Sequence, residues 1–275
     1  MANKKLVSYT IDKDVIESFN QYCELNNINK SALIESYIIE KCGFIDIELN
    51  KCKESPIYFI NNYCTIQSPI KGNVPFILHS FQENIINRFD DNKWSITLQP
   101  RQMGMTSLAI AYSLWFMIFN DNKNIYFESP NDNMDKVMIS KLKNMYNNLP
   151  TWFKEHIPTV FTSSIYSFKL SNNSNVGPLL PKKNIDLCVL DNASYISDIN
   201  SQKEYIKDSS KIIMYSQSNK PSWFDELIDE SISGLNDIDI NVLHWKMMPG
   251  RTDDWKAEME NTLGTDEFKK QYIIE

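Results

Sequence analysis

The stretch TLQPRQMGMTSL, residues 97–108, joins two apolar segments of different pattern. The run before it, WSITL (94–98), predicts a strand, and the run from Thr106 to Phe119 predicts an apolar helix. A strand, a tight glycine loop and a helix form the arrangement in which loop N–H groups and the helix N-terminus bind phosphate. A lysine normally precedes the threonine and contacts the phosphate oxygens, but this chain has Met105 there. The stretch therefore predicts a phosphate-binding loop that lacks its lysine.

Composition narrows the class of protein. The chain has 275 residues, 42% of them hydrophobic, and a formal net charge of -7. A chain of this length and composition can form one large hydrophobic core and a small additional module. It has no run of about 18 apolar residues and no secretion signal at its start, so we expect no membrane partner. Its 5 cysteines and 3 histidines are scattered. This favours reduced thiols in a cytosol over disulfides or a metal site.

Strand and helix patterns alternate after residue 55. Besides 94–98, the expected strands are 124–128, 186–190, 211–215 and 239–245, and a second long helix is expected from Met134 to Leu149. This alternation predicts an α/β fold with a mostly parallel sheet, whose ligands bind at the carboxyl ends of the strands. The charged C-terminal run WKAEMENTLGTDEFKKQYII predicts a solvated pair of helices.

The first 44 residues have a different pattern. KKLVSYTID (4–12) alternates like a strand with one buried face, on which Val7, Tyr9 and Ile11 lie. Asp12 is the expected N-cap of a first helix, and a second helix begins at residues 29–31 and ends at Gly43. We expect a separate module at 1–44, a charged, pattern-free linker at 45–54 and the main domain at 55–275.

The order of these elements, together with the segment NINKSALIESYI, resembles the ribbon-helix-helix family of DNA-binding proteins. The resemblance implies a dimer in which two strands form a ribbon that enters the major groove of double-stranded DNA. It places Leu6, Ser8 and Thr10 against the bases. It places Asn29, Lys30 and Ser31 on a phosphate. Residues 1–43 hold five lysines and six acidic residues, so DNA binding should depend weakly on salt. A ribbon that only dimerises is the alternative.

The main domain resembles the ATPase domain of the large terminase subunit of T4-like tailed phages. The resemblance begins with SPIYFINNYCTIQSPIKGNVPFILHSFQENII, continues through RQMGMTS and LCVLDNAS, and ends with HWKMMPGRTDDWKAEMENTLGTDEFKKQYIIE. It implies a P-loop NTPase-like fold, ATP and Mg²⁺ as cofactors, and a place in a ring that packages DNA. A nuclease domain normally follows in this family. We expect it either to be missing from this protein or to lie beyond the given sequence.

The resemblance assigns several site residues by position. The nucleotide contacts are Gln82 (in the adenine-side pair with Phe81), Arg101, Gly104, Thr106 and Asp191. Thr106 and Asp191 are also the expected Mg²⁺ ligands.

Four positions depart from the family pattern. Met105 replaces the lysine of the loop, and Asn192 replaces the glutamate that activates the attacking water. An amide cannot accept a proton at neutral pH, so the general base is lost. Residues 216–219, Ser-Gln-Ser-Asn, keep only the asparagine of a Thr-Thr-Pro-Asn motif. The segment VGPLLPKKN lacks the expected arginine, although Lys182 and Lys183 lie in it.

These features favour a phage- or satellite-encoded accessory protein in the cytoplasm of an infected bacterium. Such a protein would bind DNA as a dimer and act on packaging, recruiting the terminase and portal machinery or inhibiting the motor through its degenerate ATPase domain. One alternative is an active ATPase in which Arg101 replaces the missing lysine. Another is a ribbon-helix-helix transcriptional repressor, which would protect two half-sites of a palindromic operator.

Overall fold

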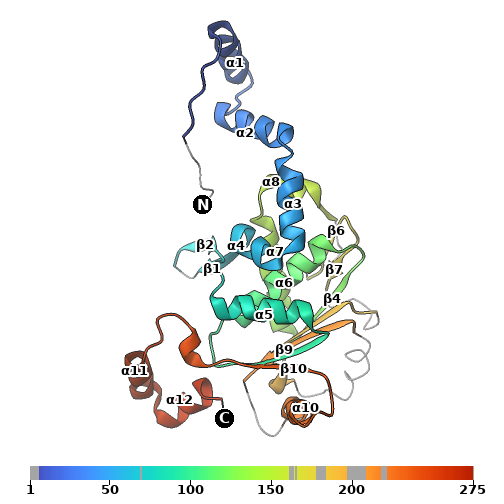
Figure 1. Ribbon diagram of the computed structural model, residues 1–275, viewed down its shortest axis with the longest axis vertical. Helices are drawn as coiled ribbons and strands as arrows, with labels where there is room; N and C mark the ends of the chain where they lie inside the picture. The colour runs from blue at the N-terminus through green and yellow to red at the C-terminus, as the bar shows by residue number, and fades with distance from the viewer. Residues whose placement is uncertain are drawn as a thin grey trace. The chain divides into compact units, whose positions relative to one another are not determined.

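The structure, a computed structural model, describes residues 6–68, 70–160, 164, 166–177, 184–196, 209–217 and 222–274. The chain divides into two compact units, Met1–Glu54 and Ser55–Glu275 (Figure 1). In the described ranges no helix has the length and apolar character needed to span a membrane.

The first unit contains three helices, α1 (Lys13–Leu25), α2 (Lys30–Lys41) and α3 (Phe44–Glu54). Side-chain caps fix where the first two begin. The Asp12 carboxylate accepts a hydrogen bond from the Asp14 N–H at 2.9 Å, and the Asn29 side chain accepts one from the Ala32 N–H at 3.0 Å. Both helices therefore begin at the predicted residues.

Two expectations for this unit differ from the structure. Residues 6–12 form no strand. The physical reason is that a strand needs a hydrogen-bonded neighbour, and no described strand pairs with this segment. The expected linker at 45–54 is helical, within α3, because Ile45, Leu49 and Cys52 recur at helical spacing. The ribbon-helix-helix assignment stays a prediction.

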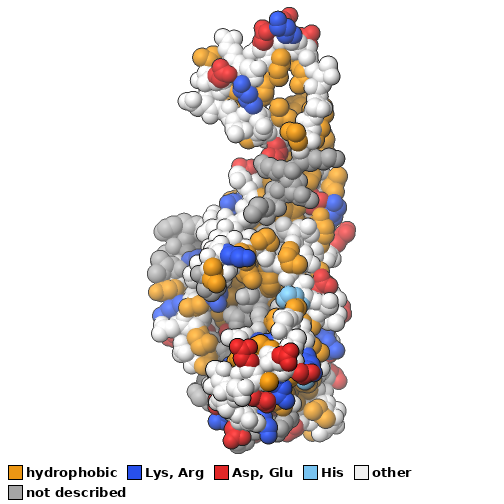
Figure 2. Space-filling model, turned by 90° about the vertical axis from the view of Figure 1, so that its left-hand side faces the viewer, with side chains coloured by type: hydrophobic (Ala, Val, Ile, Leu, Met, Phe, Trp, Pro, Cys, Tyr) orange, Lys and Arg blue, Asp and Glu red, His pale blue; other side chains and the backbone are white. Residues whose placement is uncertain are grey.

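Apolar side chains lie on the surface of the first unit (Figure 2, top). Cys23 is the one buried residue of α1, and α2 has none among the residues described. The large side chains left exposed on the two helices include Val15, Tyr22, Leu25, Tyr37 and Ile38. A unit of about 50 residues rarely buries its own apolar surface, so this exposure favours a partner.

The second unit is built around one sheet, as predicted. Its strands are β3 (Trp94–Leu98), β4 (Asn124–Glu128), β5 (Thr159–Val160), β6 (Phe168–Leu170), β7 (Asn175–Val176), β8 (Leu187–Asp191), β9 (Lys211–Ser216) and β10 (Asp239–Val242). Their order is β10-β3-β9-β8-β4-β7-β6-β5. The strands from β10 to β7 are parallel, and β6 and β5 continue the sheet antiparallel. A separate hairpin pairs β1 (Thr65–Ser68) with β2 (Gly72–Pro75).

Helices cover both faces of this sheet. The helices of the unit are α4 (Pro56–Tyr63), α5 (Ser80–Asp91), α6 (Met105–Phe119), α7 (Asp132–Asn147), α8 (Thr151–His156), α10 (Trp223–Ile232), α11 (Asp253–Leu263) and α12 (Thr265–Tyr272), with short 3-10 turns η1 (Ala193–Tyr195) and η2 (Trp245–Met247). The helix α6 packs against α4, α5, α7 and β8. Its sequence is apolar on all sides because eleven of its residues are buried. On the opposite face, Phe224 and Ile228 of α10 pack on Ile212 and Met214 of β9.

The C-terminal helices are less solvated than their charge pattern predicts. Phe268 and Tyr272 of α12 are buried and pack with Trp245 and Trp255. These aromatic contacts hold α11 and α12 together as a small core of their own.

The parallel register brings the carboxyl ends of four strands to one edge of the sheet. Leu98 pairs with Ser216, Asp191 with Tyr215, and Glu128 lies opposite Leu190. The loop that follows Leu98 therefore lies beside Asp191, although more than 80 residues separate them in sequence.

Candidate nucleotide site

The loop of residues 99–104 is held in a curved shape by its main chain. Gln102 and Gly104 adopt the left-handed region, with φ of 60° and 77°. The Gln99 N–H donates to the Ser216 carbonyl at 2.9 Å, and the Arg101 N–H donates to the Gln271 carbonyl at 3.0 Å. Among the described residues, no partner accepts from the N–H groups of 102–106. These five donors lie at the start of α6, where an anion is favoured.

Gln82 supports the loop from behind. Its side-chain oxygen accepts from the His79 N–H at 3.0 Å, and its Nε2 donates to the Met103 carbonyl at 3.2 Å. Gln82 is buried and lines neither of the two cavities described below. The structure therefore places it as a support of the loop's main chain.

Met105 begins α6 and is 2% exposed, so its side chain belongs to the core. Met103 is also buried, at 1%. The two methionines flank Gly104 and make the inner side of the loop apolar. The position where a phosphate-binding loop carries its lysine therefore presents no charge.

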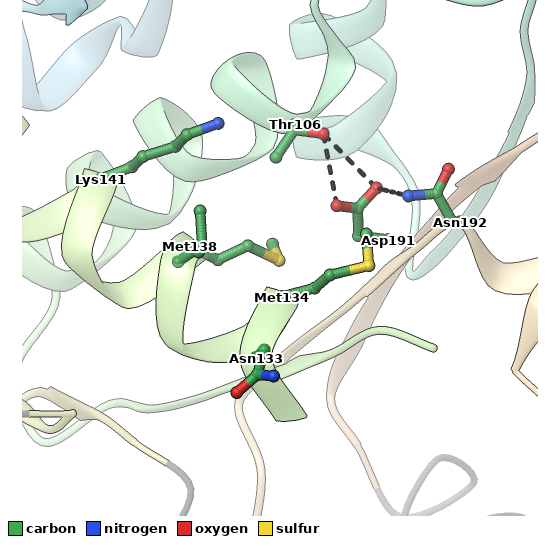
Figure 3. Close-up of a pocket in the computed structure, with 8 residues that line it drawn as sticks. Thr106, Asn133, Met134, Met138, Lys141, Asp191 and Asn192 are labelled. Atoms are coloured by element: carbon green, nitrogen blue, oxygen red, sulfur yellow. Dashed lines mark hydrogen bonds between the residues drawn. The ribbon is translucent and has the colours of Figure 1, made fainter. Parts of the chain in front are cut away.

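Thr106, Asp191 and Asn192 form a hydrogen-bonded group at the sheet edge (Figure 3). The Thr106 hydroxyl donates to both carboxylate oxygens of Asp191, at 3.4 Å each. The Asn192 amide donates to Asp191 Oδ1 at 3.0 Å. Asn192 adopts a left-handed φ of 54°, which asparagine tolerates better than most residues. Its amide thus faces the carboxylate as a donor.

Burial raises the pKa of the Asp191 carboxyl to about 6, although Thr106 and Lys141 oppose the shift. Burial also raises the pKa of Asp135, on α7, to about 7. The hydroxyl of the fully buried Tyr215 lies close enough to Asp191 and Thr106 to interact with them electrostatically, but it makes no hydrogen bond of ordinary geometry. The sheet edge therefore holds a costly carboxylate and an unsatisfied hydroxyl side by side.

Two cavities meet at this group. One, of about 370 Å³, is lined by Gln99, Pro100, Arg101, Gln102, Met103, Gly104, Met105, Thr106, Ser107, Asp191, Asn192, Tyr195 and Gln217. The other, of about 300 Å³, is lined by Thr106, Asp191, Asn192 and the α7 residues Asn133, Met134, Val137, Met138 and Lys141. Thr106, Asp191 and Asn192 line both. The total space suits a ligand of nucleotide size.

The structure brings most of the predicted nucleotide residues together. Four of the five, Arg101, Gly104, Thr106 and Asp191, line the loop cavity, and so do Met105 and Asn192, two positions that depart from the family pattern. Arg101 Nε donates to the Gln217 side chain at 3.4 Å. The segments with Lys182, Lys183, Ser218 and Asn219 lie outside the described residues.

The predicted DNA contacts lie in the first unit. Leu6, Ser8 and Thr10 are exposed in a segment without regular structure. Asn29 caps α2, and Lys30 pairs with Glu24 at 3.1 Å. Ser31 is exposed in the first turn of that helix.

Arg251 is a residue of the site that the sequence reasoning missed. Its guanidinium donates to the Arg101 carbonyl at 3.0 Å and lies over the rings of Trp255 and Tyr272, 4.8 and 5.3 Å from their centroids. About 150 residues separate it from the loop, and no local pattern marks it. Lys141 was missed for a simpler reason, since a lysine on an amphipathic helix looks like ordinary solvent-facing charge.

Asp191 and Thr106 fit a Mg²⁺ ion that a bound nucleotide would also ligate. A single carboxylate, a hydroxyl and phosphate oxygens make a common magnesium donor set. Within the described ranges, no group of three or more His, Cys, Asp or Glu side chains could hold a metal alone. Any divalent ion here would therefore depend on the nucleotide.

Solved structures of phage terminases share this fold. The crystal structure of the HK97 bacteriophage large terminase matches with a TM-score of 0.64 and 17% identity, over 81% of this chain and 54% of that protein. The chain thus spans about half of the HK97 protein's length. The ATPase domain of the large terminase of Thermus phage P74-26 matches with a TM-score of 0.54 and 14% identity, over 68% of this chain and 91% of that domain.

A third match is the large terminase of a thermophilic bacteriophage, solved in complex with ADP. Its TM-score is 0.53 and its identity 10%, over 71% of this chain and 52% of that protein. No model of a protein family matches the sequence. At these identities the likeness establishes the fold of the second unit, a terminase ATPase-like α/β fold.

Replacing Gly104 by Ala should lower the free energy of unfolding by about 2 kcal/mol. Alanine is strained in the left-handed backbone conformation of Gly104, and its Cβ would displace Gln82 from its hydrogen bond to the Met103 carbonyl. The new Cβ would lie 2.9 Å from Gln82 Nε2, and that amide is buried and bonded at both ends. Urea unfolding measures the loss. Gly234→Ala is the control, because Gly234 has a similar φ of 71° with no heavy atom within 4 Å of an added Cβ. Equal losses would show that Gln82 moves without cost.

Replacing Asp191 by Asn should stabilise the protein at pH 7.5 by about 2 kcal/mol. The folded-state pKa of about 6 lies above the ordinary 3.8, so the folded protein binds the proton more tightly. The protonated Asp191 carboxyl therefore contributes most to the free energy of unfolding below pH 4, and this contribution is lost as the pH rises through 6. Urea unfolding should show the variant's advantage at pH 7.5 and none at pH 4.

The exposed Asp121 supplies the control, since Asp121→Asn should leave stability unchanged at both values. An Asp191→Asn variant with no advantage at pH 7.5 would contradict a buried, ionised Asp191.

Proposed function

We propose that this protein is a phage- or satellite-encoded accessory factor of DNA packaging whose terminase-like unit does not hydrolyse ATP. The observation that carries the proposal is the state of two positions at the sheet edge. Met105 is buried in the core, and Asn192 donates its amide to Asp191. Neither side chain can do the work of the lysine and glutamate that the terminase resemblance assigns to these positions.

The two functions that Met105 and Asn192 lack, a positive charge and a general base, are the ones that accelerate phosphoryl transfer. The reaction depends on positioning and on stabilising charge that develops on the phosphate oxygens. A methionine supplies no charge to those oxygens. A neutral amide cannot take a proton from the attacking water, and Asn192 is already oriented toward the carboxylate.

Nucleotide binding is better preserved than catalysis. The loop keeps five N–H groups without a described acceptor, and Thr106 lies beside Asp191 as a magnesium pair. The large terminase of the thermophilic bacteriophage, which has a similar fold, carries ADP in its structure. We therefore propose ATP or ADP with Mg²⁺ as the ligand, bound without turnover.

The first unit supplies the proposed link to DNA. Its exposed apolar side chains fit a unit that buries them in a dimer, and residues 6–12 fit a strand that pairs only with a second chain. The dimer would bind double-stranded DNA through this ribbon in the cytoplasm of the infected host. The second unit would then bind the terminase and portal machinery as a subunit that cannot hydrolyse ATP.

The natural protein, added to a reconstituted motor of authentic large terminase, should reduce DNA packaging and release no phosphate itself. The Met105→Lys/Asn192→Glu variant should release phosphate from ATP and should inhibit less, because it regains the charge and the base. Phosphate release and DNA protected from nuclease are the two readouts.

Met105→Leu/Asn192→Gln is the matched control, which changes both positions without adding charge or a base. It should behave like the natural protein, and thermal unfolding verifies that all three proteins are folded. Steady phosphate release by the natural protein would instead support an active ATPase in which Arg101 replaces the lysine. An unchanged packaging rate with the natural protein in stoichiometric excess over the large terminase would contradict the proposed inhibition.

The ribbon proposal makes opposite predictions for two neighbouring residues. Tyr9→Asp should convert the full chain to monomers in sedimentation equilibrium, because Tyr9 is on the face expected to be buried. Ser8→Asp should keep the dimer and weaken DNA binding at least tenfold, because Ser8 is on the face expected to meet the bases. Two variants with the same effect on dimerisation would contradict a two-faced strand.

A further inference from the structure

The cavity between α6 and α7 is lined by a positively charged side chain that does not line the loop cavity. Of the described residues that line it, Lys141 alone is cationic. Its side chain extends from α7 toward Thr106, above the carboxylate of Asp191 (Figure 3). Lys141 lines the cavity beside α7, whereas Met105 lines the loop cavity.

Lys141 has neither an ion pair nor a ring contact among the described residues, unlike two other lysines near it in the sequence. Lys123 pairs with Asp186 at 3.0 Å, and Lys136, also on α7, lies over the ring of Tyr166 at 5.0 Å. Asp191 feels the charge of Lys141, but no ion pair forms between them. The ammonium group is thus near a carboxylate and a hydroxyl without being bound by either.

The same corner carries an energetic cost. The Tyr215 hydroxyl is fully buried beside Thr106 and Asp191 and makes no hydrogen bond of ordinary geometry with them. Leaving a buried hydroxyl unsatisfied costs roughly 1–3 kcal/mol. Tyr215 lines neither cavity, so a ligand would contact Thr106 and Asp191 and not this hydroxyl.

The observations favour an anionic ligand. Residues 102–106, with their five N–H groups, line the loop cavity, Lys141 lines the cavity beside α7, and Thr106 lines both. A phosphate group between them would meet donors on two sides. Its repulsion from Asp191 would be offset by Lys141, and by Mg²⁺ when present.

We propose that Lys141 supplies from α7 the positive charge that Met105 does not, and that it binds the terminal phosphate of a nucleoside di- or triphosphate held by the loop. This inference rests on the proposed function, because it names the contact that lets the same site hold nucleotide without the usual lysine. It makes Lys141 a binding residue, and it requires no hydrolysis.

Isothermal titration of the full chain with ADP and Mg²⁺ tests this inference. Lys141→Met keeps the aliphatic stem and removes the charge, and it should weaken ADP binding at least tenfold. Lys141→Arg should bind within about threefold of the natural protein. Lys136→Met removes the same charge from the same helix outside the cavity, and it should bind like the natural protein. Thermal unfolding without ligand verifies that each variant is folded.

Inorganic pyrophosphate gives a second readout that separates phosphate contacts from those of the base. It should displace ADP from the natural protein and should bind Lys141→Met too weakly to be measured. Equal ADP affinity in Lys141→Met and Lys136→Met would overturn the inference, as would a natural protein that binds no ADP at millimolar concentration.

Absence of ADP binding by the natural protein would also remove the ligand named in the proposed function, whereas equal affinities of Lys141→Met and Lys136→Met would overturn the present inference alone. The proposed function fails when the natural protein releases phosphate or leaves packaging unchanged. The present inference fails on affinity alone.

Discussion

The geometry of the site depends on the hydrogen bonds that attach the main chain of one short loop to the rest of the unit. The Gln99 N–H binds the end of β9, Gln82 binds the Met103 carbonyl, and Arg251 binds the Arg101 carbonyl. All three use main-chain atoms of the loop, so they do not depend on which side chains the loop carries. The fold can therefore hold this loop shape with a methionine at position 105.

The stability cost of the site is preserved together with its shape. A buried carboxylate at Asp191 and a buried hydroxyl without a partner at Tyr215 both lower the stability of the folded state. A scaffold with no remaining use for ligands at this edge would gain stability by replacing them. Their presence supports the proposal of a site that binds a ligand.

The sequence predicted the central sheet well because each strand has a local signal. Residues 94–98 and 124–128 are mainly apolar segments, and β8 is buried throughout and apolar up to its last residue, Asp191, because both faces of the sheet are covered. Long-range attachments have no such signal. Nothing near Arg251 indicates that it binds a loop 150 residues earlier, and only packing brings Lys141 beside Thr106. At residues 45–54 a helical period was present but hidden by the charges around it.

The attachment of Arg251 joins two parts of the unit that are far apart in sequence. The aromatic core of α11 and α12 holds the guanidinium, and the Gln271 carbonyl accepts from the Arg101 N–H. By thermodynamic linkage, whatever stabilises this loop conformation stabilises the docked C-terminal helices by the same free energy, and the reverse also holds. A protein that binds the docked helices α11 and α12 would therefore change the affinity of the loop for a ligand. The effect is reciprocal, so a ligand bound at the loop would change the affinity of α11 and α12 for such a protein by the same factor.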